Sequence, residues 1–528
     1  MRPGVTPSPP PRTHSRDNVR LHALAAAAMM AVAPVFALAQ AQGQTSASAP
    51  PPPAMITVEA GATATDNGAL AAKGLERSDL ILSLRPRIEV VRRRAGLELD
   101  LDAAVTMFDY AHGSRDGSVL PELGATLRST IVERWLYLDA AARVRQSEAD
   151  PFGARADDAL GANRRTQGSY SISPYLEREF MPDTTVAARL DAAITTNGAG
   201  DGSRLRSNHT LVRLERKPLP WGALLEWSRL DNETRGAVES QFTLDTVRAR
   251  VTADIGRDLV LGLVGGADRS RVLLSRDHDT LYGITGRWSP GPRTELAATV
   301  ERRFFGNSGE LKLRHRMPFM SLVVSAGRQP MMSQASLGVL GQATDLRGML
   351  DAILTTRYPD PVTRTELVNS LVATLGMNSR GAQAVELVAE YPQLQTAGSA
   401  TLVLLGSRNT LSVSAYAQTQ KRLQRENEVL LVPTTADTRQ WGASVQFNRR
   451  LTPQLSADLQ VRYSKIRGLA DRALELSKEG AVRIALMQNV AARSSVSAGL
   501  QYQRFGTNVS GQHPYRATQA FIGVNHRF

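Results

Sequence analysis

Long stretches of strict alternation between apolar and polar residues constrain this chain more than any other feature. In LSADLQVRYSK (455–465), every second residue from Leu455 to Tyr463 is apolar, and the intervening residues are polar or charged. Successive side chains of an extended strand point to opposite faces of its sheet, so the pattern predicts a strand with one apolar and one polar face. The same pattern recurs in QWGASVQFN (440–448), SVSAGLQYQ (495–503) and TVAARLDAAIT (185–195).

The length of these segments and the turns between them favour a membrane barrel. The strands of a soluble β-sandwich also alternate between apolar and polar residues, so alternation alone does not decide. The segments run for about 9–14 residues, longer than usual in soluble sheets and sufficient for a tilted strand to cross a bilayer. Short turns alternate with longer polar loops, as in outer-membrane barrels. The short turns are predicted at 93–96, 133–134, 181–184, 218–220, 255–258, 289–292, 316–319, 406–409, 451–454 and 491–494.

These ten turns also predict the strand number. A barrel with both chain ends on the turn side then has about 22 antiparallel strands, and its closure leaves no unpaired edge facing lipid. The count requires a first strand within 55–67 and two strands within 126–144. If either fails, 16–20 strands is the alternative.

The N-terminus is typical of an export signal over residues 1–39. Basic residues up to Arg20 precede an apolar run from Leu21 to Phe36, and ALA at 37–39 offers small residues for cleavage. The apolar run is short for a membrane anchor, the alternative interpretation. We therefore expect export through the Sec pathway to the bacterial outer membrane, a Pro/Ala/Ser-rich linker at 40–54 and a barrel at 55–528.

The amino-acid composition limits the chemistry that the chain can perform and the partners that it can bind. The chain has no cysteine, which excludes disulfides, thiol catalysis and thiolate metal sites. Its formal net charge is +13, and because residues 1–39 contain four arginines and one aspartate, the remainder still carries about +10. An exported chain is not expected to meet nucleic acid, so the excess favours an anionic partner such as an acidic polysaccharide. General arginine richness of the genome is the alternative explanation.

The chain ends on FIGVNHRF (521–528), in which Ile522, Val524, His526 and Phe528 fall on one side of an extended strand. A terminal aromatic residue behind alternating apolar residues resembles the signal that the outer-membrane assembly machinery recognises. Phe528 is therefore the expected assembly signal.

One interval, 344–376, has helical rather than strand periodicity. Apolar residues from Leu346 to Leu354 follow helical spacing, and YPDP at 358–361 ends that pattern. A second helix is predicted to begin at Thr363, with Glu366 completing a capping box. Such a pair cannot form lipid-facing wall, so we expect it in a loop, in the lumen or at the mouth. It either staples a long loop or acts as a plug or docking element.

Several short motifs together resemble the PEP-CTERM system-associated outer-membrane β-barrel family. They are TDN (65–67), LILSLRPRIEV (80–90), the helical insert, GSRNTLSVS (406–414) and the terminal Phe528. The resemblance implies a role beside exosortase protein sorting and exopolysaccharide production, in export or surface display. It implies no catalytic residues.

The sequence offers no constellation typical of an enzyme, metal site or cofactor site. The histidines beyond residue 39 show no ligand spacing, and Ser207 with His209 is the nearest approach to a nucleophile and base on one strand face. The glycines of GLVGGAD (262–268) favour close strand packing over phosphate binding. We expect no catalytic, cofactor-binding or metal residues.

Two functions remain open from the sequence. One is a channel or export conduit whose inward residues line a hydrated lumen, with outer-membrane lipid around it and an anionic polysaccharide as candidate ligand. The other is a plugged structural or scaffolding barrel without transport activity. The candidate lumen-lining residues are Arg189, Asp191, Gln460 and Arg462.

Overall fold

The computed structural model describes residues 54–148, 150–153, 163–198, 203–236, 239–256, 258–272, 275–331, 346–355, 357–360, 363–365, 367–368, 392–423 and 437–528. The predicted signal at 1–39 and all of the predicted linker except Ala54 lie outside these residues. Among the described residues, no helix is both long and apolar enough to cross a membrane.

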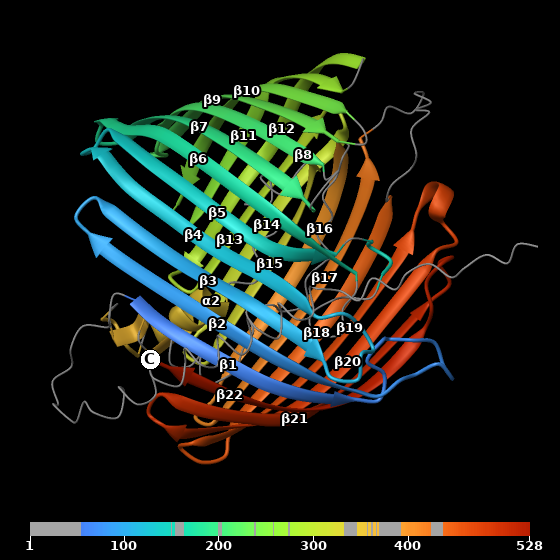
Figure 1. The fold of residues 1–528 in the computed structure, drawn as a ribbon. Coiled ribbons are helices and arrows are strands. Elements are labelled where there is room, and N and C mark those ends of the chain that lie inside the picture. Colours follow the sequence, from blue (N-terminus) through green and yellow to red (C-terminus); the bar gives the residue numbers. More distant parts are fainter. Residues whose placement is uncertain are drawn as a thin grey trace, which may run out of the picture.

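The described residues form one closed antiparallel sheet of 22 strands, which confirms the predicted barrel and its strand number (Figure 1). The strands are β1 Ala54–Thr65, β2 Asp79–Arg94, β3 Leu97–Tyr110, β4 Ser118–Val132, β5 Leu136–Glu148, β6 Arg164–Met181, β7 Thr184–Asn197, β8 Arg204–Arg216, β9 Trp221–Arg235, β10 Ser240–Ile255, β11 Leu259–Val272, β12 Ser275–Gly291, β13 Thr294–Arg303, β14 Gly306–Met317, β15 Met320–Met331, β16 Gln393–Leu405, β17 Asn409–Arg422, β18 Thr438–Arg450, β19 Leu455–Gly468, β20 Leu476–Ala491, β21 Ser494–Thr507 and β22 Tyr515–Arg527.

The barrel closes where the first strand meets the last. β1 pairs with β2 on one side and with β22 on the other, from Thr57 opposite Arg527 to Thr65 opposite Gln519. Figure 1 shows the two strands side by side, in blue and red. The ladder continues past β22, because the N–H of Phe528 donates to the carbonyl oxygen of Ile56 at 2.9 Å. Every strand therefore has two neighbours, as lipid requires.

All ten predicted turns are confirmed and lie at one end of the barrel, which we call the turn end. The segment at 126–144 divides as expected, since β4 stops at Val132 and β5 starts at Leu136. The longer connections lie at the opposite end, which we call the loop end; there β4 begins at Ser118 and β21 continues to Thr507. The strands run from 10 to 18 residues, more than the ~9–11 that cross a bilayer, so the wall extends beyond the membrane.

The two faces of the wall differ in the way the alternation predicts. Apolar side chains on the outward face are exposed, such as Leu263 (70%) and Leu500 (60%), whereas inward Gln440 is 0% exposed. Large aromatic side chains are exposed on the outer surface near the turn end, as expected of a girdle at the membrane interface. They are Trp135, Phe180, Trp221, Trp288 and Phe319.

The glycines of GLVGGAD fit the predicted role in strand packing. On β11, a Cβ built on inward Gly266 would lie 2.0 Å from the carbonyl oxygen of Val247 on β10. Gly265, its neighbour on the outward face, has no atom within 4 Å of the same position. Inward Gly262 is crowded in the same way, 2.7 Å from the carbonyl oxygen of Val251, so the inward glycines of the motif are required by the close approach of the two strands.

The first predicted helix of the insert is confirmed as α2, Leu346–Leu354. In the second, residues 363–365 and 367–368 are helical, but the predicted cap is wrong. The Asp360 carboxylate accepts the N–H of Thr363 at 2.8 Å, and the Asp360 carbonyl accepts the N–H of Arg364. These bonds place Asp360 at the N-cap. An aspartate followed by proline starts a helix well, which the capping-box interpretation overlooked.

Candidate functional site in the lumen

The described part of the helical insert, 346–368 with its gaps, lies in the lumen near the turn end. It leaves the wall after Met331 and rejoins it at Gln393, both at the loop end. Nevertheless α2 packs on inward side chains close to the opposite end, above all Val403, which lies opposite Ser321 near the turn between β14 and β15. Figure 1 shows α2 at the end of the barrel that carries the C-terminus. This position excludes a simple staple of an outer loop.

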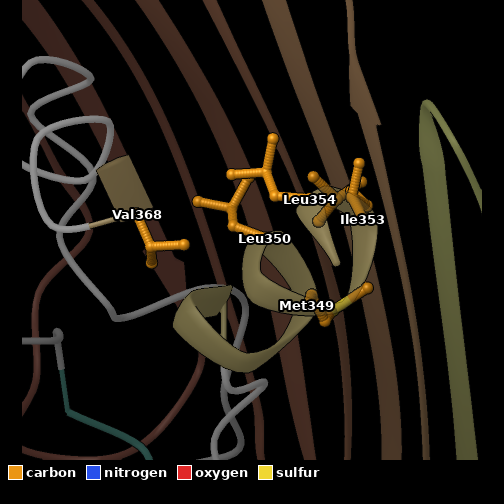
Figure 2. Packing of buried hydrophobic residues seen from close by; sticks show 6 residues of the cluster. Met349, Leu350, Ile353, Leu354 and Val368 are labelled. Carbon is orange, nitrogen blue, oxygen red and sulfur yellow. The ribbon is translucent and has the colours of Figure 1, made fainter. Parts of the chain in front are cut away.

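The contact between α2 and the wall is a compact apolar cluster. Its buried members are Met349, Leu350, Ile353, Leu354, Val368 and Val403. Figure 2 shows the four α2 side chains together, with Val368 from the following helical segment beside them. Leu350 and Val403 are 0% exposed. The insert therefore carries a hydrophobic core of its own, anchored on β15 and β16.

A polar tie connects the two helical parts of the insert. Arg364 Nε lies 2.6 Å from Asp351 Oδ1 on α2. The same guanidinium donates from Nη1 to the carbonyl oxygens of Tyr358 and Pro359, at 3.0 Å each. One side chain therefore binds the helix and the connecting turn together.

Seven inward arginines of the wall are paired with carboxylates, on the same strand or on strands one to three positions away in the sheet. The pairs are Arg85 with Glu59 and Glu122, Arg87 with Glu89 and Asp102, Arg189 with Asp139 and Asp191, Arg213 with Glu215, Arg248 with Glu226 and Glu301, Arg303 with Asp268, and Arg462 with Glu479. At these pairs, opposite charges lie side by side on the lumen wall and weaken each other's field.

Three of the predicted lumen residues meet charged partners. Arg189 contacts Asp191 at 2.7 Å and Asp139 at 3.0 Å, and its guanidinium lies 4.9 Å from the centre of the Tyr175 ring. Arg462 lies 3.3 Å from Glu479. The structure does not bring these two groups together, because they stand on β7 and β19.

Gln460, the fourth predicted residue, stands on β19 opposite Arg483 of β20 and Gln446 of β18. It lies on the inward face with Arg462 and is half-buried. Sequence alternation therefore placed all four residues on the correct face. It could not supply the cross-strand partners, which depend on register.

Exposed arginines lie at several turns of the turn end. Arg408, Arg450 and Arg493 are exposed at three successive turns of the turn end. The anionic partner expected from the net charge stays a prediction.

Uncharged polar side chains line the loop end of the lumen on β16, β17 and β18. Gln395 is directly opposite Gln420, which is directly opposite Thr438, and Gln418 is opposite Gln440. All five are buried. The sequence analysis missed this group, although its signal, glutamines at every second position of adjacent strands, is visible in the sequence.

The described residues contain no group of three or more histidine, aspartate or glutamate side chains placed to hold a metal ion.

Inward His209 lies 3.5 Å from Asp191, and Ser207 is buried two residues away. A different Ser–His contact joins neighbouring strands: Ser494 Oγ and His526 Nδ1 are 2.8 Å apart. Single-strand reasoning could not find it, because the contact depends on the pairing of β21 with β22.

No protein-family model and no curated protein matches the chain. Solved structures match at low identity. The apoprotein form of the FrpB iron transporter from Neisseria meningitidis has 10% identity and a TM-score of 0.50, over 90% of this chain and 81% of that chain. The siderophore receptor PirA from Pseudomonas aeruginosa has 10% identity and a TM-score of 0.44, over 90% and 80%. At this identity the likeness shows the fold alone, which is that of an outer-membrane barrel.

Proposed function

We propose that this protein is a gated conduit of the bacterial outer membrane, in which the insert at 344–376 closes the lumen near the turn end. The observation that carries the proposal is the position of α2. A segment that starts and ends at the loop end packs on Val403 near the other end of the same wall. A purely structural barrel has no need for a chain that traverses its lumen.

The wall and the insert contribute different parts of the proposed mechanism. The wall contributes inward polar and paired charged groups that remain hydrated when the lumen opens. The insert contributes an apolar contact of a few side chains, and the Arg364–Asp351 tie keeps it rigid. Since such small contacts open at modest free-energy cost, the insert suits a two-state element. The proposed function is passage rather than catalysis.

The proposal includes a place in exopolysaccharide export or PEP-CTERM protein sorting. Its support is the resemblance of the short motifs to that barrel family, together with a polar lumen suited to a hydrated chain. A plugged scaffold without transport is the competing function, since barrels of this size often carry a plug. The two functions differ in whether the α2 contact ever opens.

Single-channel recording in a planar bilayer tests the conduit. We expect the intact protein to show rare openings and the variant lacking 344–376 to show frequent, larger current steps. Both proteins must first show the heat-dependent gel shift of a folded barrel. A folded deletion variant without current steps would contradict the conduit and favour the scaffold.

Cysteine labelling tests gating in the intact chain, because the chain has no native cysteine. The side chain at 403 is completely covered in the closed state. Val403→Cys should react slowly with a maleimide, at a rate that rises when Leu350→Asp is added. An equally slow reaction in both proteins would show that the insert does not leave the wall. Ser464→Cys, inward on β19, provides the control for reagent entry.

A further inference from the structure

Four neighbouring acceptor oxygens at the loop end of the lumen accept no hydrogen bond within the described part of the chain. They are Oε1 of Gln393, Gln395 and Gln420 and Oγ1 of Thr438. These residues, which we call the amide row, are between 1% and 4% exposed. They share the inward face of three adjacent strands.

The geometry of the amide row is set by strand pairing. Gln395, Gln420 and Thr438 stand directly opposite one another on β16, β17 and β18. Adjacent strands lie about 4.8 Å apart, so the row presents acceptors at a regular spacing close to the length of one pyranose unit. Gln393 extends the row by two residues along β16.

Folding alone does not account for the amide row. A buried polar group without a hydrogen-bond partner lowers stability, and an apolar side chain of the same shape would be neutral or stabilising at the same place. Clusters of such unsatisfied groups are typical of positions that serve a ligand rather than the core. The missing partners of the three amide oxygens must be hydrogen-bond donors, because these oxygens only accept, whereas the Thr438 hydroxyl can donate or accept.

The surroundings of the amide row indicate an uncharged ligand. Gln418, also inward on β17, adds a neutral amide beside the row. Arg422, opposite Gln393, lies 3.8 Å from Asp437, so its charge is balanced nearby.

Apolar side chains border the same strand ends. Leu394 and Leu423 belong to one apolar cluster with Phe304 and Phe305. An apolar and aromatic cluster at the strand ends that carry the amides matches the apolar faces of sugar rings. The chemistry required is therefore a chain with many hydroxyl groups, no charge and alternating apolar faces.

We propose that the amide row binds a neutral polysaccharide chain through its hydroxyl groups. This inference rests on the proposed conduit. It adds the class of chain that would occupy the lumen. Its ligand differs from the acidic polysaccharide expected from net charge, because the row presents neutral side chains and the charge of nearby Arg422 is balanced by Asp437.

Isothermal titration of the full-length protein in detergent tests the amide row. The probes are neutral oligosaccharides (maltoheptaose, cellohexaose and chitohexaose), an oligogalacturonate and polyethylene glycol of similar length. We expect at least one neutral oligosaccharide to bind more tightly than the acidic one. Polyethylene glycol should not bind, because its ether oxygens accept hydrogen bonds but cannot donate them. No binding of any neutral oligosaccharide, or preference for the acidic one, would overturn the proposal.

The variant Gln395→Met/Gln420→Met removes two amides at nearly constant shape. Loss of two hydrogen bonds should weaken saccharide affinity roughly tenfold or more. The matched control is Gln167→Met, because inward Gln167 is equally buried but is already bonded to Arg145 and Asn197. We expect the control to keep its affinity.

Thermal unfolding separates a ligand site from a structural role. The double variant should unfold at a similar or higher temperature, since the carbonyl oxygens that it loses have no hydrogen-bond partner among the described residues. Unchanged affinity in the double variant, or a loss of stability with it, would overturn the amide row as a binding site. The failures are distinguishable: saccharide binding without current steps contradicts only the conduit, and current steps without saccharide binding contradict only the amide row.

Discussion

Arg303 and Asp268 form a bidentate ion pair on the inner face of the wall. Arg303 Nη2 lies 2.7 Å from Asp268 Oδ1, and Arg303 Nε lies 2.9 Å from Asp268 Oδ2. Their side chains are 11% and 0% exposed, and Thr246 donates a further hydrogen bond to Asp268. The pair ties β13 to β11 across β12, where β13 is only 10 residues long.

Asp268→Asn should therefore destabilise the barrel strongly. Breaking a buried pair from one side leaves a charge without compensation and costs about 3–5 kcal/mol in free energy of unfolding. Urea unfolding in detergent measures the change. Asp100→Asn is the matched control, because Asp100 pairs with Arg93 at an exposed site and should cost less than about 1 kcal/mol. Equal effects would show that the Arg303–Asp268 pair is well hydrated.

Gly266→Ala should impair barrel assembly, whereas Gly265→Ala should be tolerated. The added methyl group at 266 would overlap the Val247 carbonyl oxygen, and backbone cannot move aside as a side chain can. The position at 265 is open. The fraction of protein that shows the heat-dependent gel shift measures assembly. Similar assembly of the two variants would contradict the close packing of β10 and β11.

Val461→Arg tests which face meets lipid. Val461 is outward near the middle of β19, so the charge should cost about 2–4 kcal/mol of barrel stability. Val461→Leu, the control, should have little effect. From the sequence alone Arg462→Val is expected to be far milder, but the structure changes this expectation. Arg462→Val would remove the charged partner of Glu479, so we expect this variant also to lower barrel stability measurably.

The sequence predicted the wall well because alternation and turn chemistry are local. The face of Val461 or Gln460 follows from neighbours within a few residues, and each short turn is marked by glycine, proline or polar residues. The pairing of Arg303 with Asp268 could not be predicted in the same way, because it depends on register across three strands. The location of α2 could not be predicted either. Helical periodicity shows that the helix has an apolar face, but not which part of the wall that face packs against.

Leu350→Asp should weaken the closed state of the conduit. Leu350 is completely buried between the helical segments and the wall, and a carboxylate there loses its hydration without gaining a partner. We expect a higher open probability in planar bilayers at unchanged barrel stability, because the wall strands do not depend on the insert. Ala352→Asp, on α2 but outside the apolar cluster, serves as the control. An unaltered open probability would show that this contact does not gate the lumen.

Reversal potentials in a salt gradient test whether the paired charges of the wall weaken each other's field in an open lumen. With Arg189 paired to both Asp139 and Asp191, the variant lacking 344–376 should show weak ion selectivity despite the positive net charge. Adding Arg189→Gln leaves two carboxylates without their cation, so the preference should shift toward cations and fade as salt screens it. Arg408→Gln, at an exposed turn, should shift it less. A strong anion preference lost in Arg189→Gln would instead show that this arginine attracts anions despite its partners.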